Sequence, residues 1–598
     1  MNTPQERIAA IRHLMKAHDL MAWIIPSADP HLSEYLPRHW QARRWVSGFR
    51  GSAGTLVITS AHAGLWTDSR YWVQAEAQLA GTGITLHKLS AGNTHVSWLA
   101  SHLPADSRVG VAPDMLSLSA RLQLQQAFVP KNIRVVHERD LVAEVWADRP
   151  PLPSAPIYAH EARFVSERVD QKLSRVREAM QARGATWHLL SSLDDIAWLT
   201  NLRGADVSYN PVFLAHVLIG PDRATLFVDV QKLDARLRAS LAEAGIRCED
   251  YAQVTDAMAR VNEPLLLDPA KVAVSTLARL PGKTTVIEST NPSTLFKALK
   301  SQADIAQVRE AMVEDGIALC GFFAELEQCL AQGRPISELD VADRLLAHRQ
   351  QRRHFVSPSF GTIAGFNANG ALPHYSATPE SFSQIEGDGL LLIDSGAQYL
   401  NGTTDITRVV PVGTPSAAQK RDFTRVLKAH IALAETVFPE GIAGPLLDAI
   451  CRKPLWQAQL DFGHGTGHGI GYFLNVHEGP QVISCHSSIQ PQGAMREGMI
   501  TSIEPGLYRP GQWGIRIENL VVNQLLPPSS DIEVAPGPFM FFETLTLCPI
   551  DTRLVDPELM TQAELDWLNA YHARVRERLA DRTEGAAHEW LMRRTEPI

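Results

Sequence analysis

The stretch DFGHGTGHGIG, Asp461 to Gly471, has glycine at every second position from Gly463 onward. Its two histidines, His464 and His468, have the spacing at which a helix presents two zinc ligands in the H-E-x-x-H motif. A helix does not fit, because position 465 is glycine instead of glutamate and each glycine would cost a helix about 1 kcal/mol. An extended segment would place both histidines on one face and leave bare backbone on the other, where a substrate or another chain segment can come close. The stretch therefore predicts a functional site on a strand.

The composition is that of an ordinary soluble globular protein, with 45% hydrophobic and 20% charged residues in a chain of 598. The net charge of −9 argues against nucleic acid or an anionic membrane as the main partner. The first twenty residues carry charges throughout, and no run of about 18 apolar residues occurs, so we expect neither a targeting segment nor a spanning helix. The six cysteines are scattered without a CxxC pair, which favours free thiols and a cytoplasmic location.

Two turn-rich stretches divide the chain. The first, DRPPLPSAP from Asp148 to Pro156, has four prolines in nine residues and predicts a stiff connector. The second, ESTNPST, gives way to a helix that we expect to open near Ser301. The predicted domains are therefore residues 1–150, 157–300 and 301–598.

The first two segments have the same order of patterns. Each begins with an amphipathic helix, Thr3 to His18 or Val165 to Ala182, and continues to a short apolar strand, MAWIIPS or TWHLLSS. A polar turn and helix follow (DPHLSEY; LDDIAWL), then a glycine-containing stretch (SGFRGSAG; TNLRGAD), then a strand pair. Alternating helices and strands predict an α/β layer fold, here twice. Without a cluster of metal ligands, these two segments are expected to be architectural or to control substrate access.

The third segment opens with helices and continues with strand-like runs, so an α+β fold is expected. The Arg-rich run HRQQRRHF, His348 to Phe355, is interpreted as a solvated helix end, because phosphate binding normally recruits a broad basic face.

Four acids and one histidine of this segment lie at or beside strand-like runs. Buried carboxylates are costly unless they are paired or bind metal, and four brought together without cations would repel one another. Two divalent cations would balance four carboxylates, with a neutral imidazole as the fifth ligand, and such a donor set suits Mn²⁺, Co²⁺, Fe²⁺ or Zn²⁺. Spacing alone leaves open whether the five converge; they are Asp394, Asp405, His468, Glu504 and Glu518.

An ordered series of motifs closely resembles the metallopeptidases with the pita-bread fold: LLLIDSGAQY, NGTTDITR, HGTGHGIG, NVHEGP, SIEPG and RIENL. Within that clan the chain is most similar to Xaa-Pro aminopeptidase, or aminopeptidase P, in its long three-domain cytosolic form. The likeness extends over the whole chain, from SEYLPRHWQARRWVSGFRGSAGTLVIT to EWLMRRTEPI. It implies two creatinase-like N-terminal α/β domains followed by a pita-bread catalytic domain, and a homodimer.

The resemblance also implies the roles of the ligands. Asp394 should bind one metal ion, and His468 with Glu504 the other, whereas Asp405 and Glu518 should bridge the two. Asp394 and Asp405 are expected on neighbouring strands joined by a turn at Ser395–Gly396. A metal-bridging hydroxide would be the nucleophile.

Further residues have implied roles around these ligands. Glu504 doubles as general base, His464 shuttles protons, His477 contacts the transition state, and His374 of ALPHY lies in the substrate pocket. Arg516, two residues before Glu518 and thus on the same strand face, is expected to orient that bridging carboxylate. For Tyr508 of EPGLY the sequence leaves two roles open, contact with the site or packing in the core.

The sequence thus predicts an aminopeptidase with two divalent ions, Mn²⁺ by preference, that releases the N-terminal residue of short peptides with proline in second position. Proline lacks an N–H and restricts the preceding residue, so a dedicated apolar pocket is expected for its ring. A prolidase, a methionine aminopeptidase and a non-catalytic pita-bread binding module are the alternatives. The N-terminal repeats speak against the methionine enzyme, and the five retained ligands speak against the binding module.

Overall fold

The computed structural model describes residues 3–527 and 537–598, which form two compact units. The N-terminal unit contains residues 1–160 and 167–293, and the C-terminal unit contains residues 161–166 and 294–598. The first unit holds most of the two segments that the sequence pattern separates, whereas residues 161–166 and 294–300 of the second segment belong to the C-terminal unit with the third segment. No helix in the described ranges is both long and apolar enough to cross a membrane.

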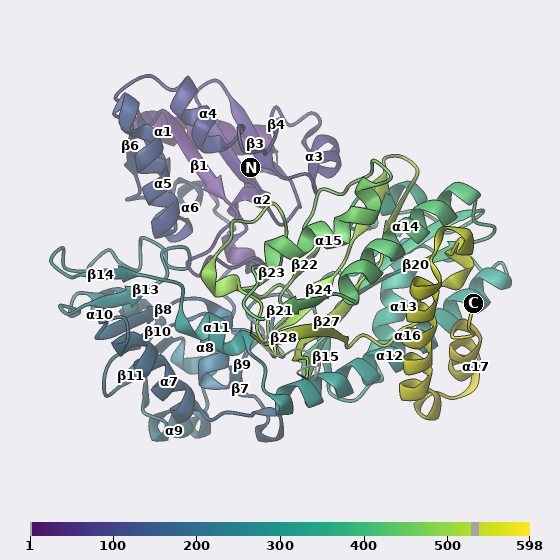
Figure 1. Cartoon of the computed structure of the whole chain (residues 1–598). Coiled ribbons are helices and arrows are strands. Elements are labelled where there is room, and N and C mark those ends of the chain that lie inside the picture. Colours follow the sequence, from purple (N-terminus) through teal and green to yellow (C-terminus); the bar gives the residue numbers. More distant parts are fainter. Residues whose placement is uncertain (1–2, 528–536) are drawn as a thin grey trace. The chain divides into compact units, whose positions relative to one another are not determined.

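The first half of the N-terminal unit is a six-stranded sheet in the order β4-β3-β2-β1-β5-β6, with helices on both faces (Figure 1). Ile11 of the first helix packs with Ile25 and Leu56 on one face, whereas Leu99 and Phe128 pack with Val57 on the other. Its strands are β1 Ala22–Pro26, β2 Thr55–Thr59, β3 Ala63–Thr67, β4 Thr85–Lys88, β5 Arg108–Val111 and β6 Arg134–Val136. Its helices are α1 Pro4–Ala17, α2 Ala42–Ser47, α3 Trp72–Leu79, α4 His95–His102, α5 Leu118–Phe128 and α6 Leu141–Val145.

The second half repeats this topology, with strand order β12-β11-β10-β8-β13-β14 and the same alternation of parallel and antiparallel pairs. The predicted repeat is confirmed. The strands are β8 Trp187–Leu190, β10 Ala215–Ile219, β11 Ala224–Val228, β12 Ile246–Glu249, β13 Leu265–Leu267 and β14 Val286–Glu288, beside the small pair β7 Tyr158–Ala159 and β9 Leu202–Arg203. The helices are α7 Val169–Gln181, α8 Leu193–Thr200, α9 Ala235–Glu243 and α10 Val254–Met258.

One predicted helix of the repeat is wrong. LDDIAWL forms α8, but DPHLSEY, residues 29–35, is a turn. The carboxylate of Asp29 accepts hydrogen bonds from the backbone N–H groups of His31 (2.9 Å) and Ser33 (3.0 Å). Such a side-chain bond gives the backbone an alternative to the helix.

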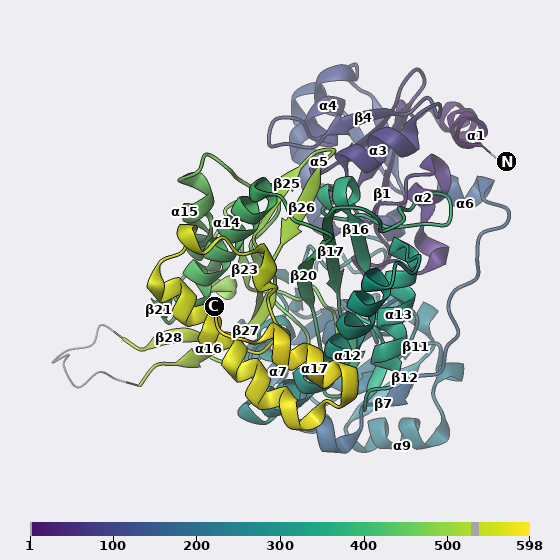
Figure 2. The ribbon, with the colours of Figure 1, turned by 90° about the vertical axis from the view of Figure 1, so that its right-hand side faces the viewer.

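The helices of the C-terminal unit pack in groups, α12 against α13 and α17, and α14 against α15 (Figure 2). Ser301 caps α12, so the helix opens where the sequence predicts. The helices are α11 Pro292–Ala298, which begins just before the boundary between the units, α12 Gln302–Ala331, α13 Glu338–Gln350, α14 Ala417–Ala434, α15 Gly444–Trp456, α16 Gln562–Leu579 and α17 Gly585–Arg594.

The Arg-rich run from His348 to Phe355, which begins in the last turn of α13, is only partly a solvated helix end. Arg349 is buried, and its guanidinium donates to both carboxylate oxygens of Asp315 at 2.8 and 3.1 Å. Arg353 remains largely exposed. The prediction is wrong for Arg349, because a buried acid on α12 draws it inward.

The strands of the C-terminal unit form two main antiparallel sheets, β16-β17-β20 and β21-β28-β27-β24. The first consists of β16 Ile363–Phe366, β17 Gly389–Ser395 and β20 Ile406–Val412; the second of β21 Val437–Pro439, β24 Ile500–Ile503, β27 Asn519–Leu525 and β28 Phe539–Thr544. Smaller sheets contain β15 Phe355–Pro358, β18 Ala397–Tyr399 and β19 Gly402–Thr403; β22 Gly467–His468 and β23 Val482–Ile483; and β25 Gly506–Arg509 and β26 Trp513–Arg516.

Candidate metal centre

The glycine-rich stretch from Asp461 to Gly471 is extended only in part. Gly467 and His468 form β22, which pairs with β23, whereas His464 lies in irregular chain. The period-two argument therefore does not apply to His464. The bare glycine face is present: a Cβ at Gly467 would overlap the carbonyl oxygen of Ser502, and a Cβ at Gly469 would overlap that of Glu478. The close partner on this face is backbone of the same unit.

Asp394 and Asp405 lie at one end of the β17–β20 pair. Asp394 is opposite Thr407 in the register, and Asp405 directly precedes β20. The strands are neighbours as predicted, but the chain between them is not a tight turn at Ser395–Gly396, because it first forms β18 and β19.

Glu504 and Glu518 are brought together in a similar way at the end of the second sheet. Ile503 of β24 pairs with Asn519 of β27, so the residue after β24 and the residue before β27 lie side by side. Two β-strand pairs, rather than one helix, thus supply the four carboxylates.

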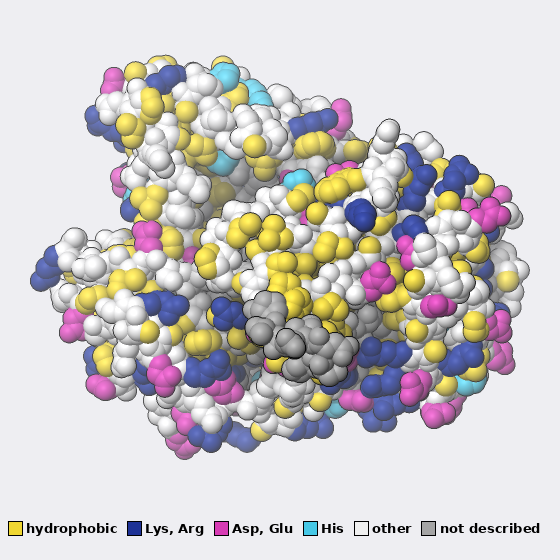
Figure 3. Space-filling view, viewed as in Figure 1, with side chains coloured by type: hydrophobic (Ala, Val, Ile, Leu, Met, Phe, Trp, Pro, Cys, Tyr) yellow, Lys and Arg dark blue, Asp and Glu magenta, His cyan; other side chains and the backbone are white. Residues whose placement is uncertain are grey.

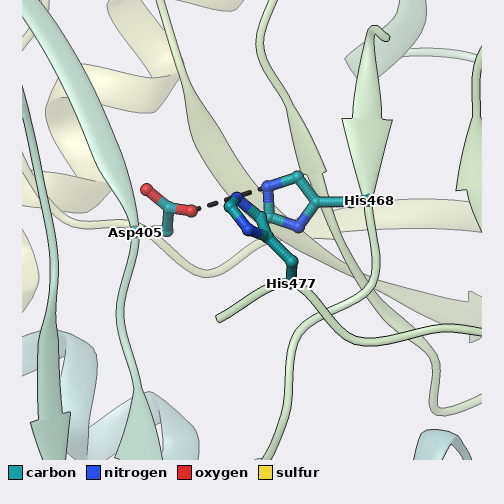
Figure 4. A group of neighbouring side chains, drawn as sticks. All are labelled: Asp405, His468 and His477. Atoms are coloured by element: carbon teal, nitrogen blue, oxygen red, sulfur yellow. Dashed lines mark ion pairs between the residues drawn. The ribbon is translucent and has the colours of Figure 1, made fainter. Parts of the chain in front are cut away.

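All five predicted ligands converge. Their ligand atoms fall into overlapping groups whose members lie within 4.8 Å of one another: Asp394, Asp405 and Glu518; His468, Glu504 and Glu518; and Asp405, His468 and His477. Figure 4 shows His468 and His477, from different segments, both directed toward Asp405. Their rings are nearly perpendicular, with centroids 4.4 Å apart.

Burial and mutual repulsion dominate the electrostatics of the carboxylates in the cluster. Burial, together with the neighbouring acids, raises the pKa of Asp405 and of Glu518 well above the usual range. Burial also raises the pKa of Glu504, to about 7. Arg516 is the guanidinium that pairs with the cluster, through Asp394. Divalent cations would remove this penalty.

The donor atoms also fit such cations. Nε2 of His468 lies 3.4 Å from Oε1 of Glu504 and 3.6 Å from Oδ2 of Asp405, beyond ordinary hydrogen-bond length. Two atoms that each bind one ion at about 2.1 Å lie roughly 3.0–3.5 Å apart. Nδ1 of His468 lies 3.0 Å from the carbonyl of Gly469, which leaves Nε2 as the ligand atom. Oδ1 of Asp394 is buried without a hydrogen bond.

Arg516 differs from its predicted role. Its Nη2 donates to Oδ2 of Asp394 at 2.6 Å, and it reaches Glu518 only through the hydroxyl of Thr407. The shared strand face does not exist, because β26 ends at Arg516 and β27 begins at Asn519. Arg516 therefore orients Asp394 directly.

Tyr508 connects this arginine to His464. Its hydroxyl accepts from Nη1 of Arg516 at 2.6 Å and lies 2.8 Å from Nε2 of His464. Because Nδ1 of His464 lies 2.8 Å from the carbonyl of Gly465, the consistent arrangement has Nδ1 as donor and Nε2 as acceptor of the tyrosine proton. The open question on Tyr508 is thus answered: it contacts the site.

His374 lies in the loop after the 3-10 helix Asn367–Ala371. Nη2 of Arg516 lies 3.4 Å from the carbonyl of Pro373, so this loop borders the same arginine that holds Asp394. The structure therefore brings the His374 loop, the His464–Tyr508 pair and the acid cluster to one region of the C-terminal unit.

Sequence reasoning missed several supporting residues. Thr407 donates to Oε2 of Glu518 at 2.9 Å, and Oγ of Ser502 accepts from the backbone N–H of His468 at 3.0 Å. Arg452 of α15 is fully buried and donates to the carbonyls of Phe462 and His464, both at 2.7 Å. Thr407 could have been found, since it lies two residues after Asp405 on a predicted strand; Arg452 has no local signal.

The chain matches known families over nearly its whole length. Residues 306–524 match metallopeptidase family M24, residues 7–145 and 148–304 each match a creatinase/prolidase N-terminal domain, and residues 538–598 match the C-terminal region of peptidase M24. Aminopeptidase P2 of Arabidopsis thaliana is 39% identical, over 99% of this chain and 88% of the relative. The chain belongs to the aminopeptidase P group of family M24. A probable Xaa-Pro aminopeptidase P of Coprinopsis cinerea is 37% identical over 99% of this chain and 98% of the relative's length.

The fold agrees with this membership. The crystal structure of X-prolyl aminopeptidase from Caenorhabditis elegans, described as a cytosolic enzyme with a di-nuclear active site, matches with a TM-score of 0.95. The two chains are 31% identical, and the match covers 100% of each. These matches confirm two predictions from the sequence. They are the resemblance to aminopeptidase P and the fold of two creatinase-like domains followed by a pita-bread domain.

The raised pKa values predict how pH and metal affect stability. Without metal, folding raises the pKa of Glu504 from its usual value near 4.5 to about 7, so the folded state binds protons that the unfolded chain has lost. That stabilisation is complete below about pH 4.5 and disappears as the pH rises through 7. We expect the melting temperature of chelator-treated protein to fall between pH 5 and pH 8, and added divalent metal to raise it more at pH 8. Calorimetry at both pH values tests this; equal metal-induced shifts would contradict it.

Proposed function

We propose that this chain is a dinuclear aminopeptidase that releases the N-terminal residue of peptides with proline in second position. The observation that carries the proposal is the convergence of four carboxylates and one imidazole in a fold shared, over its full length, with Xaa-Pro aminopeptidases. Two divalent ions bound there would act as Lewis acids and lower the pKa of the attacking water. We assign Asp394 to one ion, His468 and Glu504 to the other, and Asp405 and Glu518 to both.

The residues around the cluster leave it ready to bind cations. Arg516 donates to Oδ2 of Asp394 and Thr407 donates to Oε2 of Glu518, and since a carboxylate has about four lone-pair sites, each acid keeps donor capacity for cations. The hydroxyl of Ser502 lies 3.3 Å from Oε1 of Glu504. Such outer contacts fix ligand orientation, and their loss typically costs 10–100-fold in metal affinity or activity.

The assigned chemistry needs a proton to move from the attacking water to the proline nitrogen, because that nitrogen leaves as a secondary amine. We assign the first transfer to the carboxylate of Glu504. His464, which accepts the Tyr508 proton at Nε2, is the proposed shuttle, and His477, beside His468, is the proposed contact to the transition state. His374 is proposed to contact substrate from its loop.

A specificity screen tests this function. We expect purified protein with added Mn²⁺ to cleave Xaa-Pro-Yaa tripeptides with kcat/KM at least about tenfold above both Xaa-Pro dipeptides and Met-Ala-Yaa peptides, a discrimination of the size that one pocket contact provides. Preference for the dipeptides would identify a prolidase. Purification without metal, together with no hydrolysis, would identify a binding module. Comparing Mn²⁺, Co²⁺ and Zn²⁺ tests our preference for manganese.

We further propose a cytoplasmic homodimer. The described part of the C-terminal unit exposes several large apolar side chains, and Figure 3 shows apolar side chains gathered on this unit near β21. A patch of this kind commonly covers a protein–protein contact. Exposed apolar side chains of this unit include Val437, Leu446, Trp456, Ile489, Leu525 and Leu526. Sedimentation equilibrium would reveal a mass twice that of the chain.

A further inference from the structure

A buried carboxylate, Glu338, lies at the start of α13 and outside the metal cluster. Its side chain is completely buried. Within the part of the chain that the structure describes, no Lys, Arg or His pairs with it by an ion pair. A buried charge without a counterion costs several kcal/mol unless hydrogen bonds compensate it. Here the compensation comes entirely from donors of one segment, residues 366–383.

Both oxygens of Glu338 are saturated by that segment. Oε1 accepts from the backbone N–H of Phe366 at 2.7 Å, and Oε2 accepts from the backbone N–H of Ser383 at 2.7 Å. The hydroxyl of Tyr375 donates to Oε2 at 2.8 Å, and Nδ2 of Asn369 lies 3.0 and 3.1 Å from the two oxygens. Glu338 therefore binds both ends of the segment and its middle, next to His374.

The opposite side of the segment is packed against the strand that carries Arg516. A Cβ at Gly514 of β26 would overlap the carbonyl oxygen of Gly370, so the two backbones are in direct contact. The side-chain oxygen of Asn367 accepts from the backbone N–H of Leu390, at the start of the Asp394 strand, at 3.0 Å. The segment thus lies between Glu338 on one side and β17 and β26, which end at the metal centre, on the other.

We infer that Glu338 is a positioning residue: it holds residues 366–383 so that His374 is fixed relative to the metal ligands. This inference rests on the proposed function, in which His374 contacts the peptide. A carboxylate is suited to the task because it accepts from two backbone N–H groups at once. A glutamine cannot, since its NH₂ group would face the N–H of either Phe366 or Ser383.

Glu338→Gln is the informative variant, and Asp340→Asn is its matched control. Asp340 lies in the same first turn of α13, but the described hydrogen bonds of its side chain go to the capping residue Ser337 and not to the 366–383 segment, so its loss weakens the cap and removes no bond to that segment. We expect Glu338→Gln to lower kcat/KM for Xaa-Pro-Yaa on the order of 10–100-fold, mainly through KM, because a small misplacement of a positioning group has effects of this size. Asp340→Asn should stay within about twofold of wild type.

A double-mutant cycle separates positioning from general damage. In a His374→Ala background, Glu338→Gln should cost less than about twofold further, because the group that it positions is gone. Equal losses in both backgrounds, or wild-type kinetics for Glu338→Gln, would overturn the inference. If Glu338→Gln does not fold, Tyr375→Phe removes one donor and keeps the charge, and the same cycle with His374→Ala decides.

Hydrogen exchange distinguishes a failure of this inference from a failure of the proposed function, because it does not depend on catalysis. Amides of residues 366–383 should exchange faster in Glu338→Gln than in wild type or Asp340→Asn, whereas amides of β20, to which this segment makes no described hydrogen bond, should not change. If the wild-type protein does not hydrolyse Xaa-Pro-Yaa, the proposed function fails, and the exchange data still report on the segment. Unchanged exchange in Glu338→Gln would refute the inference alone.

Discussion

Replacing Asp405 by asparagine or Glu518 by glutamine is expected to lower kcat/KM for Xaa-Pro-Yaa peptides by about 10³-fold or more. Metal ions supply several kcal/mol of transition-state stabilisation, and each 1.36 kcal/mol is tenfold in rate. Both residues belong to the group Asp394, Asp405 and Glu518, and both are buried, so solvent does not replace the lost charge. If they bridge two ions, each single change should reduce the content of both metals in elemental analysis.

The fold provides the control for these variants. The pKa of Asp405 and of Glu518 is raised by burial and by the other acids, so the metal-free cluster destabilises the folded state near neutral pH. Removing one charge should therefore leave the metal-free variant at least as stable as metal-free wild type at pH 8. Near-normal turnover in metal-replete buffer would refute the ligand assignment, and unfolding of the metal-free variant would refute the electrostatic explanation.

The sequence predicts the layers of the fold because local patterns determine them. Alternating helices and strands in residues 1–150 and 157–300 form two sheets of one topology. In the exception, residues 29–35, the carboxylate of Asp29 accepts hydrogen bonds from backbone N–H groups and the segment forms a turn instead of a helix. No periodicity in the sequence reports such a bond.

The spacing of the ligands along the sequence does not by itself predict that they converge. Asp394 and Asp405 meet because β17 and β20 pair in one register, and Glu504 and Glu518 meet because Ile503 pairs with Asn519. Register depends on contacts between strands far apart in sequence. The motif resemblance does predict the convergence, because an ordered set of motifs indicates a known fold and therefore its strand pairing.

The supporting contacts are harder still to predict. Arg516 and Asp394 form an ion pair although they are 122 positions apart, whereas the expected partner Glu518 is two residues from Arg516 but lies after a change of strand. Glu338 has no motif of its own, although it binds the loop of a predicted site residue. Long-range hydrogen bonds to buried charges are determined by the assembled fold.

His468→Ala and His464→Ala are expected to fail in different ways, although the two residues lie in one glycine-rich stretch. Nε2 of His468 faces Glu504 and Asp405, whereas Nε2 of His464 is bonded to the hydroxyl of Tyr508. His468→Ala should therefore lose one equivalent of metal and nearly all activity. His464→Ala should retain both metals and lose about 10²–10⁴-fold in kcat, the usual contribution of a proton-transferring group.

The outcome depends on which ring nitrogen each histidine has available. In both residues Nδ1 lies within 3.0 Å of the next residue's carbonyl oxygen, so the Nδ1 contacts are alike and the difference lies in the surroundings of Nε2. Tyr508→Phe is the companion variant: it removes the bonds to His464 and to Nη1 of Arg516 but no bond to a ligand, and it should lower kcat with full metal content. Elemental analysis with steady-state kinetics distinguishes the cases. Equal metal loss in His464→Ala and His468→Ala would make His464 a ligand, and the proton-shuttle assignment would then be wrong.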